Sequence, residues 1–175
     1  MEETKEKKIE GAYAKLVSNL EDLTKIYRTL LDLVRKEKDL LIAADLEALG
    51  ENNKAKEALI YKLRAQDSAR ERYARELANL IGADVKQPRL LDIAQRLEGA
   101  AGDRLRAIHS TLEILIRRVS EINKENETYT QSALNTLNGA MGEIKETLAP
   151  KKTYGSQGKM AHGPEKAGNF VSKEA

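Results

Sequence analysis

Apolar side chains recur at alternating spacings of four and three residues along the first 41 positions of the chain. Nine of the ten positions in this frame are apolar, and Glu37 is the exception. The frame consists of Ile9, Tyr13, Leu16, Leu20, Leu23, Tyr27, Leu30, Val34, Glu37 and Leu41. A strand requires alternation at every second residue, whereas this average spacing of about 3.5 residues is typical of a helix in a coiled coil. The pattern therefore predicts a helix over residues 3–43.

A second helix is expected after a tight reversal at residues 43–45. The first frame breaks at Asp45, whose side chain favours the N-cap position of a new helix. This helix should cover residues 46–81 and end at Gly82. Its apolar positions are Leu49, Leu59, Leu63, Tyr73, Leu77 and Leu80, interrupted by Asn52, Lys56, Gln66 and Arg70. So thin a frame predicts a narrow contact with the first helix.

Two more helices are expected beyond the loop that follows Gly82. An amphipathic segment predicts a short helix over residues 90–98, and the glycines of residues 99–102 predict a flexible connection. The 4,3 spacing resumes over residues 103–148, with a polar interruption at 123–132 and a shift of one residue in phase beyond it. The last turns therefore cannot face the partner of the earlier turns without a twist or a break.

These elements predict an all-α fold. We expect an elongated antiparallel helical hairpin or coiled-coil bundle of three long helices plus a short connecting helix, within residues 1–149. Residues 150–175 are rich in Gly, Lys and Ser and have no apolar periodicity. That composition predicts a disordered, flexible C-terminal tail.

Charge and composition exclude several kinds of function. The 30 Lys and Arg residues nearly balance the 28 Asp and Glu residues, so net charge does not require a nucleic-acid partner. The chain contains no cysteine, which excludes disulfides, thiolate metal sites and thiol catalysis. Six of the first eight residues are charged and no long apolar run occurs, so we expect neither a signal peptide nor membrane insertion. We therefore expect a cytoplasmic protein.

The side chains offer little for catalysis. His109 and His162 lack further ligands at metal-binding spacing, and residues 155–159 lack the spacing and flanking elements of a phosphate loop. The arginines between residues 64 and 75 alternate with acidic residues, which indicates a solvated helix face. We expect no catalytic, cofactor-binding or metal-binding residue, and hence no enzyme and no cofactor.

The apolar positions of the last helix are candidates for binding a partner. They are Leu134, Leu137, Met141, Ile144 and Leu148. Their shifted phase leaves them unsupported by the bundle, and such a face suits helix-in-groove or helix-with-helix recognition. The alternative interpretation is that this helix folds back and forms ordinary core.

Three short motifs follow one another along the chain. Residues 30–63 combine a leucine-rich helix, a D-x-E-x-L corner and a lysine followed by spaced leucines. Asn123 and Asn126 then form a pair three residues apart, and Tyr154 and Gly155 follow the last helix. In this order the motifs resemble the FlgN family of flagellar type III export chaperones, whose members carry a similar asparagine pair and often end in a similar Tyr-Gly segment.

The resemblance implies a chaperone that binds the helical termini of the hook–filament junction proteins FlgK and FlgL, prevents their premature assembly and delivers them to the export gate, FlhA. The five apolar positions of the last helix would then bind the cargo, and Tyr154 and Gly155 would dock to the gate. A competing hypothesis is a coiled-coil scaffold or self-assembling structural protein that uses the first helix, through Leu16, Leu23 and Leu30. A homodimer is compatible with both hypotheses.

Overall fold

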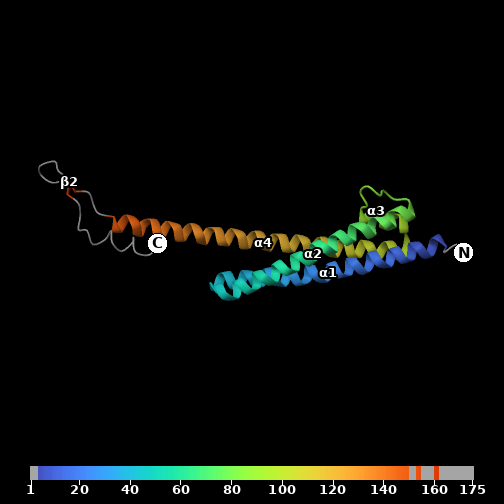
Figure 1. Ribbon diagram of the computed structural model, residues 1–175, viewed down its shortest axis with the longest axis horizontal. Helices are drawn as coiled ribbons and strands as arrows, with labels where there is room; N and C mark the ends of the chain where they lie inside the picture. Colours follow the sequence, from blue (N-terminus) through green and yellow to red (C-terminus); the bar gives the residue numbers. More distant parts are fainter. Residues whose placement is uncertain (1–3, 150–152, 155–159, 162–175) are drawn as a thin grey trace. The chain divides into compact units, whose positions relative to one another are not determined.

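The computed structural model of the protein describes residues 4–149, 153–154 and 160–161 (Figure 1). Its helices are α1 (Lys5–Ala43), α2 (Leu46–Ile81), α3 (Leu90–Leu97) and α4 (Gly99–Leu148). The strands β1 (Thr153–Tyr154) and β2 (Met160–Ala161) pair antiparallel, with Thr153 opposite Ala161. The predicted all-α class is confirmed, and this two-residue strand pair is an addition to it. The remainder of the tail predicted to be disordered lies outside the described residues.

Contacts divide the chain into two units, residues 1–127 and 128–175. The first unit contains α1, α2, α3 and the beginning of α4, and the second contains the remaining turns of α4 and the strand pair. The α4 helix runs from Gly99 to Leu148 without a break. The polar residues 123–132 therefore do not interrupt the helix.

The reversal between α1 and α2 is stabilised by capping of both helix ends. Ala44 adopts a φ of 53°, and the backbone N–H of Asp45 donates to the carbonyl of Leu40 at 3.1 Å. The Asp45 carboxylate accepts the N–H of Ala48 at 3.0 Å, a donor that the first turn of α2 cannot satisfy by itself. The predicted N-cap at Asp45 is confirmed, and the corner places α2 antiparallel beside α1 (Figure 1).

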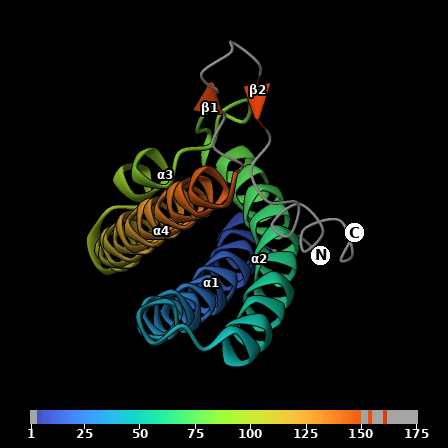
Figure 2. The ribbon, with the colours of Figure 1, turned by 90° about the vertical axis from the view of Figure 1, so that its left-hand side faces the viewer.

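The core of the first unit is built on α1, which lies beside both α2 and the first turns of α4 (Figure 2). One cluster joins Leu16 of α1 to Leu77 of α2, Ile93 of α3 and Leu105 of α4, all with no exposed surface. A second cluster joins the C-terminal half of α1 to α4. Its buried members are Leu30, Leu31, Val34, Val119 and Ile122. Each such side chain contributes about 1.5–3 kcal/mol of stability when fully buried. Because the two clusters involve different neighbours, the apolar frame of α1 is covered from two sides.

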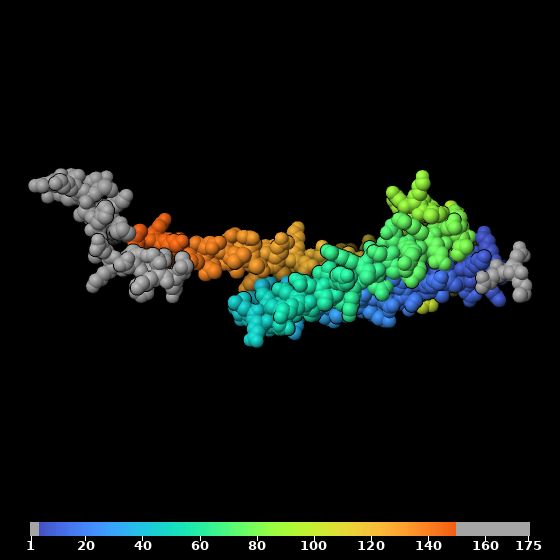
Figure 3. All heavy atoms as spheres, in the orientation of Figure 1, coloured from blue at the N-terminus to red at the C-terminus, as the bar shows by residue number. Residues whose placement is uncertain are grey.

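The connection between α3 and α4 is a close helix–helix contact. The α4 helix begins at Gly99, so the prediction of a flexible segment at residues 99–102 is wrong. Glycine is needed here for two reasons: Gly99 has a φ of 51°, and a Cβ atom at Gly102 would overlap the carbonyl oxygen of Ala94 in α3. The contact supports α3 and the preceding loop, which form the raised region over α2 in Figure 3.

We predict that Gly102→Ala lowers the free energy of unfolding by about 1–3 kcal/mol, because the added methyl group must displace α4 from α3. Gly50→Ala is the matched control, since a Cβ atom at that position of α2 meets open space. The control should stabilise the protein by up to about 1 kcal/mol. Urea unfolding followed by circular dichroism measures both variants, and equal midpoints would contradict the close packing.

Candidate functional site

The five apolar side chains predicted to bind a partner form a continuous row on the second unit's part of α4. Leu134, Leu137, Met141, Ile144 and Leu148 have exposed fractions between 49% and 58%. We call these five side chains the exposed stripe. Their 4,3 spacing places them on one face of the helix, and no charged residue occurs between positions 128 and 142. These exposed fractions favour partner binding over the alternative interpretation, in which this helix folds back and forms ordinary core.

An exposed row of this kind is unusual on a folded chain. Scattered apolar side chains are normal on protein surfaces, whereas contiguous patches of a few hundred Å² mark interaction sites. The apolar frame of α1 makes the contrast clear, because Leu16, Leu20 and Leu23 are at most 3% exposed. The exposed stripe is therefore a candidate surface for binding another apolar helix face.

The two asparagines of the predicted motif have different environments. Asn123 is exposed, whereas Asn126 is only 4% exposed. The Nδ2 atom of Asn126 donates to the carbonyl oxygen of Val34 at 3.0 Å and to Oε2 of Glu37 at 3.1 Å. Asn126 therefore joins α4 to α1, a role inside the fold that the motif alone did not indicate.

Glu37 extends this contact to α2. Its carboxylate oxygens accept hydrogen bonds from Nζ of Lys56 at 2.7 and 2.8 Å, and the two side chains are only 12% and 19% exposed. Glu37, Lys56 and Asn126 thus form a polar layer across α1, α2 and α4. The single charged position in the α1 frame is a signal that could have revealed this layer, because a buried carboxylate requires a partner.

Further buried amides fix the contact between α1 and α2. Asn52 donates to the carbonyl oxygen of Leu33 at 3.0 Å. Asn19 donates to the side chain of Gln66 at 2.6 Å and to its carbonyl at 3.1 Å. Asn52 and Gln66 are among the polar residues that interrupt the apolar frame of α2, so the interrupted frame was a sign of these contacts. Nothing in the sequence pattern indicated a contact for Asn19. Polar side chains in a helix interface favour one register, because any slip leaves their hydrogen bonds unmade.

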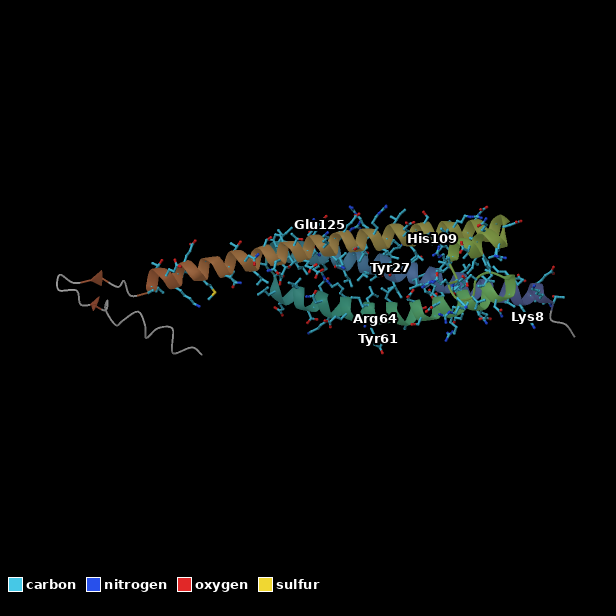
Figure 4. The ribbon with its side chains drawn as sticks, turned by 90° about the horizontal axis from the view of Figure 1, so that it is seen from above. Lys8, Tyr27, Tyr61, Arg64, His109 and Glu125 are labelled. Carbon is cyan, nitrogen blue, oxygen red and sulfur yellow. The ribbon has the colours of Figure 1, made fainter. Side chains whose placement is uncertain are left out.

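A groove of about 990 Å³ opens in the first unit, and the sequence did not predict it. All of the first unit's helices line it, with Leu23 and Tyr27 from α1 and Leu112 from α4 among the apolar side chains. Leu91 of α3 and Ile116 of α4 also line the groove and remain 48% and 45% exposed. Figure 4 shows Tyr27 in the space between α2 and α4. The groove is therefore bounded by helices and combines apolar side chains with four acidic and four basic ones.

The phenol of Tyr27 stays uncharged in this groove. Burial raises its pKa, the charge of Asp67 acts in the same direction, and Arg70 opposes both. Asp67 and Arg70 pair with each other at 2.7 Å. Tyr27 therefore presents an apolar ring with a neutral polar tip to anything that enters the groove.

The structure holds little that supports catalysis in the described residues. His109 lines the groove. No group of three potential metal ligands occurs in the part of the chain that the structure describes. His162 lies outside that part. The arginine-rich face of α2 is paired, as in the bond from Arg75 to Glu71 at 2.6 Å, which agrees with a solvated helix face. Among the helices described here, none has the length and apolarity needed to cross a membrane.

The residues predicted to dock to an export gate, Tyr154 and Gly155, follow the exposed stripe in the sequence. Tyr154 belongs to β1, where it pairs with Met160 of β2. Gly155 lies outside the described residues. Their docking role stays a prediction.

Comparison with known families gives one match. The model of the family described as FlgN protein matches residues 12–162, which is more than half of the chain. The match includes α2, α3 and α4 completely and all but the first turns of α1. No curated protein and no solved structure matches the chain.

We predict that Lys56→Met lowers the free energy of unfolding by about 1–3 kcal/mol, because it leaves the Glu37 carboxylate mostly buried without its cation. Lys38→Met is the matched control. Lys38 bonds Glu125 at 2.7 Å and lowers the pKa of that carboxyl, but both side chains are at least half exposed. The control should therefore change stability by less than about 1 kcal/mol.

Chemical denaturation of the two variants and the unmodified chain, under identical salt and pH, measures the difference. A loss that is equal in both variants would show that the polar layer is no more important than a surface ion pair.

Proposed function

Because the chain belongs to the FlgN family of flagellar export chaperones, we propose that it binds the helical termini of the hook–filament junction proteins FlgK and FlgL in the cytoplasm. On this proposal it prevents their premature assembly and delivers them to the export gate, FlhA. The observation that carries the proposal is the exposed stripe, five large apolar side chains on one face of α4. Family membership supports the general role, and the stripe supplies a surface for it.

The stripe suits a helical cargo because of its spacing. Side chains at alternating intervals of four and three residues can interlock with the same pattern on a partner helix. A terminal helix that packs only after assembly exposes an equivalent apolar face beforehand, so the two faces would cover each other. Since such binding stabilises only the covered form, it lowers the fraction of cargo that is free to aggregate.

Two glycines give this part of α4 an adjustable stability. Gly139 and Gly142 lie within the helix, and a Cβ atom would meet nothing within 4 Å at either position. Each costs about 1 kcal/mol of helix stability relative to Ala, with no packing contact in return. The 100° advance per residue places both outside the stripe. A helix of this kind is strengthened by its partner and releases it more readily than a rigid one.

Delivery to FlhA is assigned to the segment around Tyr154 and Gly155. A tyrosine combines apolar area with a polar hydroxyl, which suits a contact that must form and break. The segment follows the stripe in sequence, so cargo and gate would use different residues of the same unit.

The competing scaffold hypothesis loses its main support. It requires Leu16, Leu23 and Leu30 for assembly, but these side chains are at most 5% exposed. Burial within the chain leaves them no surface to offer to a second molecule. Assembly through the first helix would require the core to open.

We predict that Leu137→Asp combined with Ile144→Asp weakens cargo binding by about 100-fold or more, because two apolar contacts worth about 1.5 kcal/mol or more each are replaced by charges. Ile42→Asp with Ile114→Asp is the matched control, since these side chains are similarly exposed, at 60% and 54%, but lie off the stripe. Calorimetric titration with C-terminal helical segments of FlgK and FlgL measures both affinities.

Unchanged affinity of the stripe variant would reject the cargo surface, and weaker binding by the control would reject its location. Tyr154→Ala separates the two steps of the proposal, since it should leave the calorimetric affinity unchanged while reducing export of the junction proteins from cells.

We predict that Gly139→Ala with Gly142→Ala increases helicity and tightens cargo binding by about 2- to 10-fold, because less ordering remains to be done on binding. Circular dichroism and the same titration measure the two effects. Increased helicity with no gain in affinity would mean that the helix is already fully formed before cargo arrives.

A further inference from the structure

A second groove in the first unit, of about 670 Å³, lies where the N-terminal half of α1 meets the end of α3 and the start of α4 (Figure 1). Ile9, Tyr13 and Leu97 pack against the first core cluster on one side and line this groove on the other. They form an apolar floor, and Glu6 and Glu10 line the groove beside them. We call this feature the acidic groove.

Charged side chains are sorted by sign around this part of α1. Residues 5–15 contain four lysines and two glutamates, yet both glutamates line the acidic groove and none of the lysines does. Lys15 instead pairs with Glu76 of α2 at 3.3 Å. The one cation that lines the groove, Arg104, pairs with Glu21 of the same lining at 2.5 Å. The acidic groove therefore keeps an excess of two negative charges.

These two charges belong to Glu6 and Glu10, and neither has an ion-pair partner among the described residues. Side chains four residues apart on a helix lie about 6 Å from each other, so the two carboxylates repel one another. A cation placed between them would remove that repulsion. The groove thus favours a positively charged group at this point over a neutral one.

Tyr13 adds to the preference for a cation. Its hydroxyl donates to the carbonyl oxygen of Ala101 at 3.1 Å, which holds the ring in place between α1 and α4. Burial raises the pKa of this phenol, so the ring stays uncharged. A neutral aromatic ring attracts lysine and arginine side chains and offers apolar area to their neighbours.

The form of the groove suits a helix. Its α1 wall extends from Glu6 to Glu21 in steps of one, three or four residues, which places the lining side chains on one face. This wall is about 22 Å long, or four helical turns. A straight apolar groove of that length is typical of sites that bind an amphipathic helix.

We propose that the acidic groove docks an amphipathic helix of a second protein, with large apolar side chains on one face and lysine or arginine beside them. The apolar face covers Ile9, Tyr13 and Leu97, and the cations pair with Glu6 and Glu10. Nucleic acids and anionic membrane surfaces are repelled by the same carboxylates. The larger groove makes no such selection, because its four acidic and four basic side chains balance.

The test uses a labelled helical peptide of about 15 residues, with leucines at 4,3 spacing and lysines beside them. A matched peptide carries glutamate in place of every lysine. Fluorescence anisotropy during titration with the full chain measures both affinities. The lysine peptide should bind about 10-fold more tightly, and added salt should reduce the difference. Equal affinities, or no binding of the lysine peptide, would overturn the proposal.

Glu6→Gln with Glu10→Gln should weaken binding of the lysine peptide by about 3- to 10-fold, because both of its ion pairs are lost. Glu47→Gln with Glu57→Gln in α2 is the matched control, since it changes the net charge equally at two exposed positions outside the groove. The control should bind the peptide as the unmodified chain does. An equal loss in both variants would show attraction by net charge alone and would overturn the site.

A second substitution tests occupancy of the groove itself. Ala14 is exposed and lines the acidic groove, so Ala14→Lys should fill it and repel the lysine peptide, with a loss of about 10-fold or more. Ala55→Lys, at an exposed alanine of α2, is the control and should bind normally. Circular dichroism should show that both variants remain helical. Normal binding by Ala14→Lys would place the peptide elsewhere and reject the groove.

The acidic groove and the exposed stripe can fail independently. Leu137→Asp with Ile144→Asp should retain full affinity for the lysine peptide, and a loss there would make the stripe its binding surface and refute the groove. If the junction-protein segments do not bind while the lysine peptide does, only the chaperone role is refuted. If the segments bind and the lysine peptide does not, only the acidic groove is refuted.

Discussion

The arrangement of the first unit depends on covering the apolar frame of α1 from two sides. A single neighbour cannot cover it, because Leu16 and Leu20 face a cluster that includes α2 and α3 while Val34 packs with Val119 and Ile122 of α4. Once α2 and α4 both lie against α1, they flank a channel that neither fills. The groove is thus a consequence of how α1 is buried, and Leu90, Leu91 and Asp92 of α3 also line it.

Hydrophobic burial alone does not determine how the helices are aligned, because apolar side chains tolerate sliding. The polar layer supplies that information, since Glu37 can satisfy both Lys56 and Asn126 in only one register. The amides of Asn19 and Asn52 act in the same way between α1 and α2. Polar groups at these positions contribute specificity more than net stability, because each must be desolvated before it can bond.

The chain divides its apolar surface between structure and recognition. The α1 frame is buried within the chain, whereas the equivalent spacing at the end of α4 is left half exposed. A chaperone for helical termini needs such a surface, but the same surface invites aggregation unless something covers it.

Much of this was readable in the sequence. Local signals determine helices, so the 4,3 frames, the N-cap at Asp45 and the stop at Gly82 predicted where α1 and α2 begin and end. The stripe could be identified as well, because a phase shift along one helix depends only on residue spacing. The family resemblance also came from ordered local motifs, and the family match over residues 12–162 confirms it.

Tertiary structure decided the rest, because it depends on which residues far apart in sequence meet. The glycines at 99–102 suggested flexibility, and only the proximity of Ala94 explains why Gly102 belongs in a helix. The sequence identified Asn126 only as part of a family motif. Its hydrogen bonds to Val34 and Glu37 depend on α4 lying against α1. The groove, too, exists only where four helices pack together. The sequence by itself determined which faces are apolar, and the packing of α1 determined which of them stay exposed.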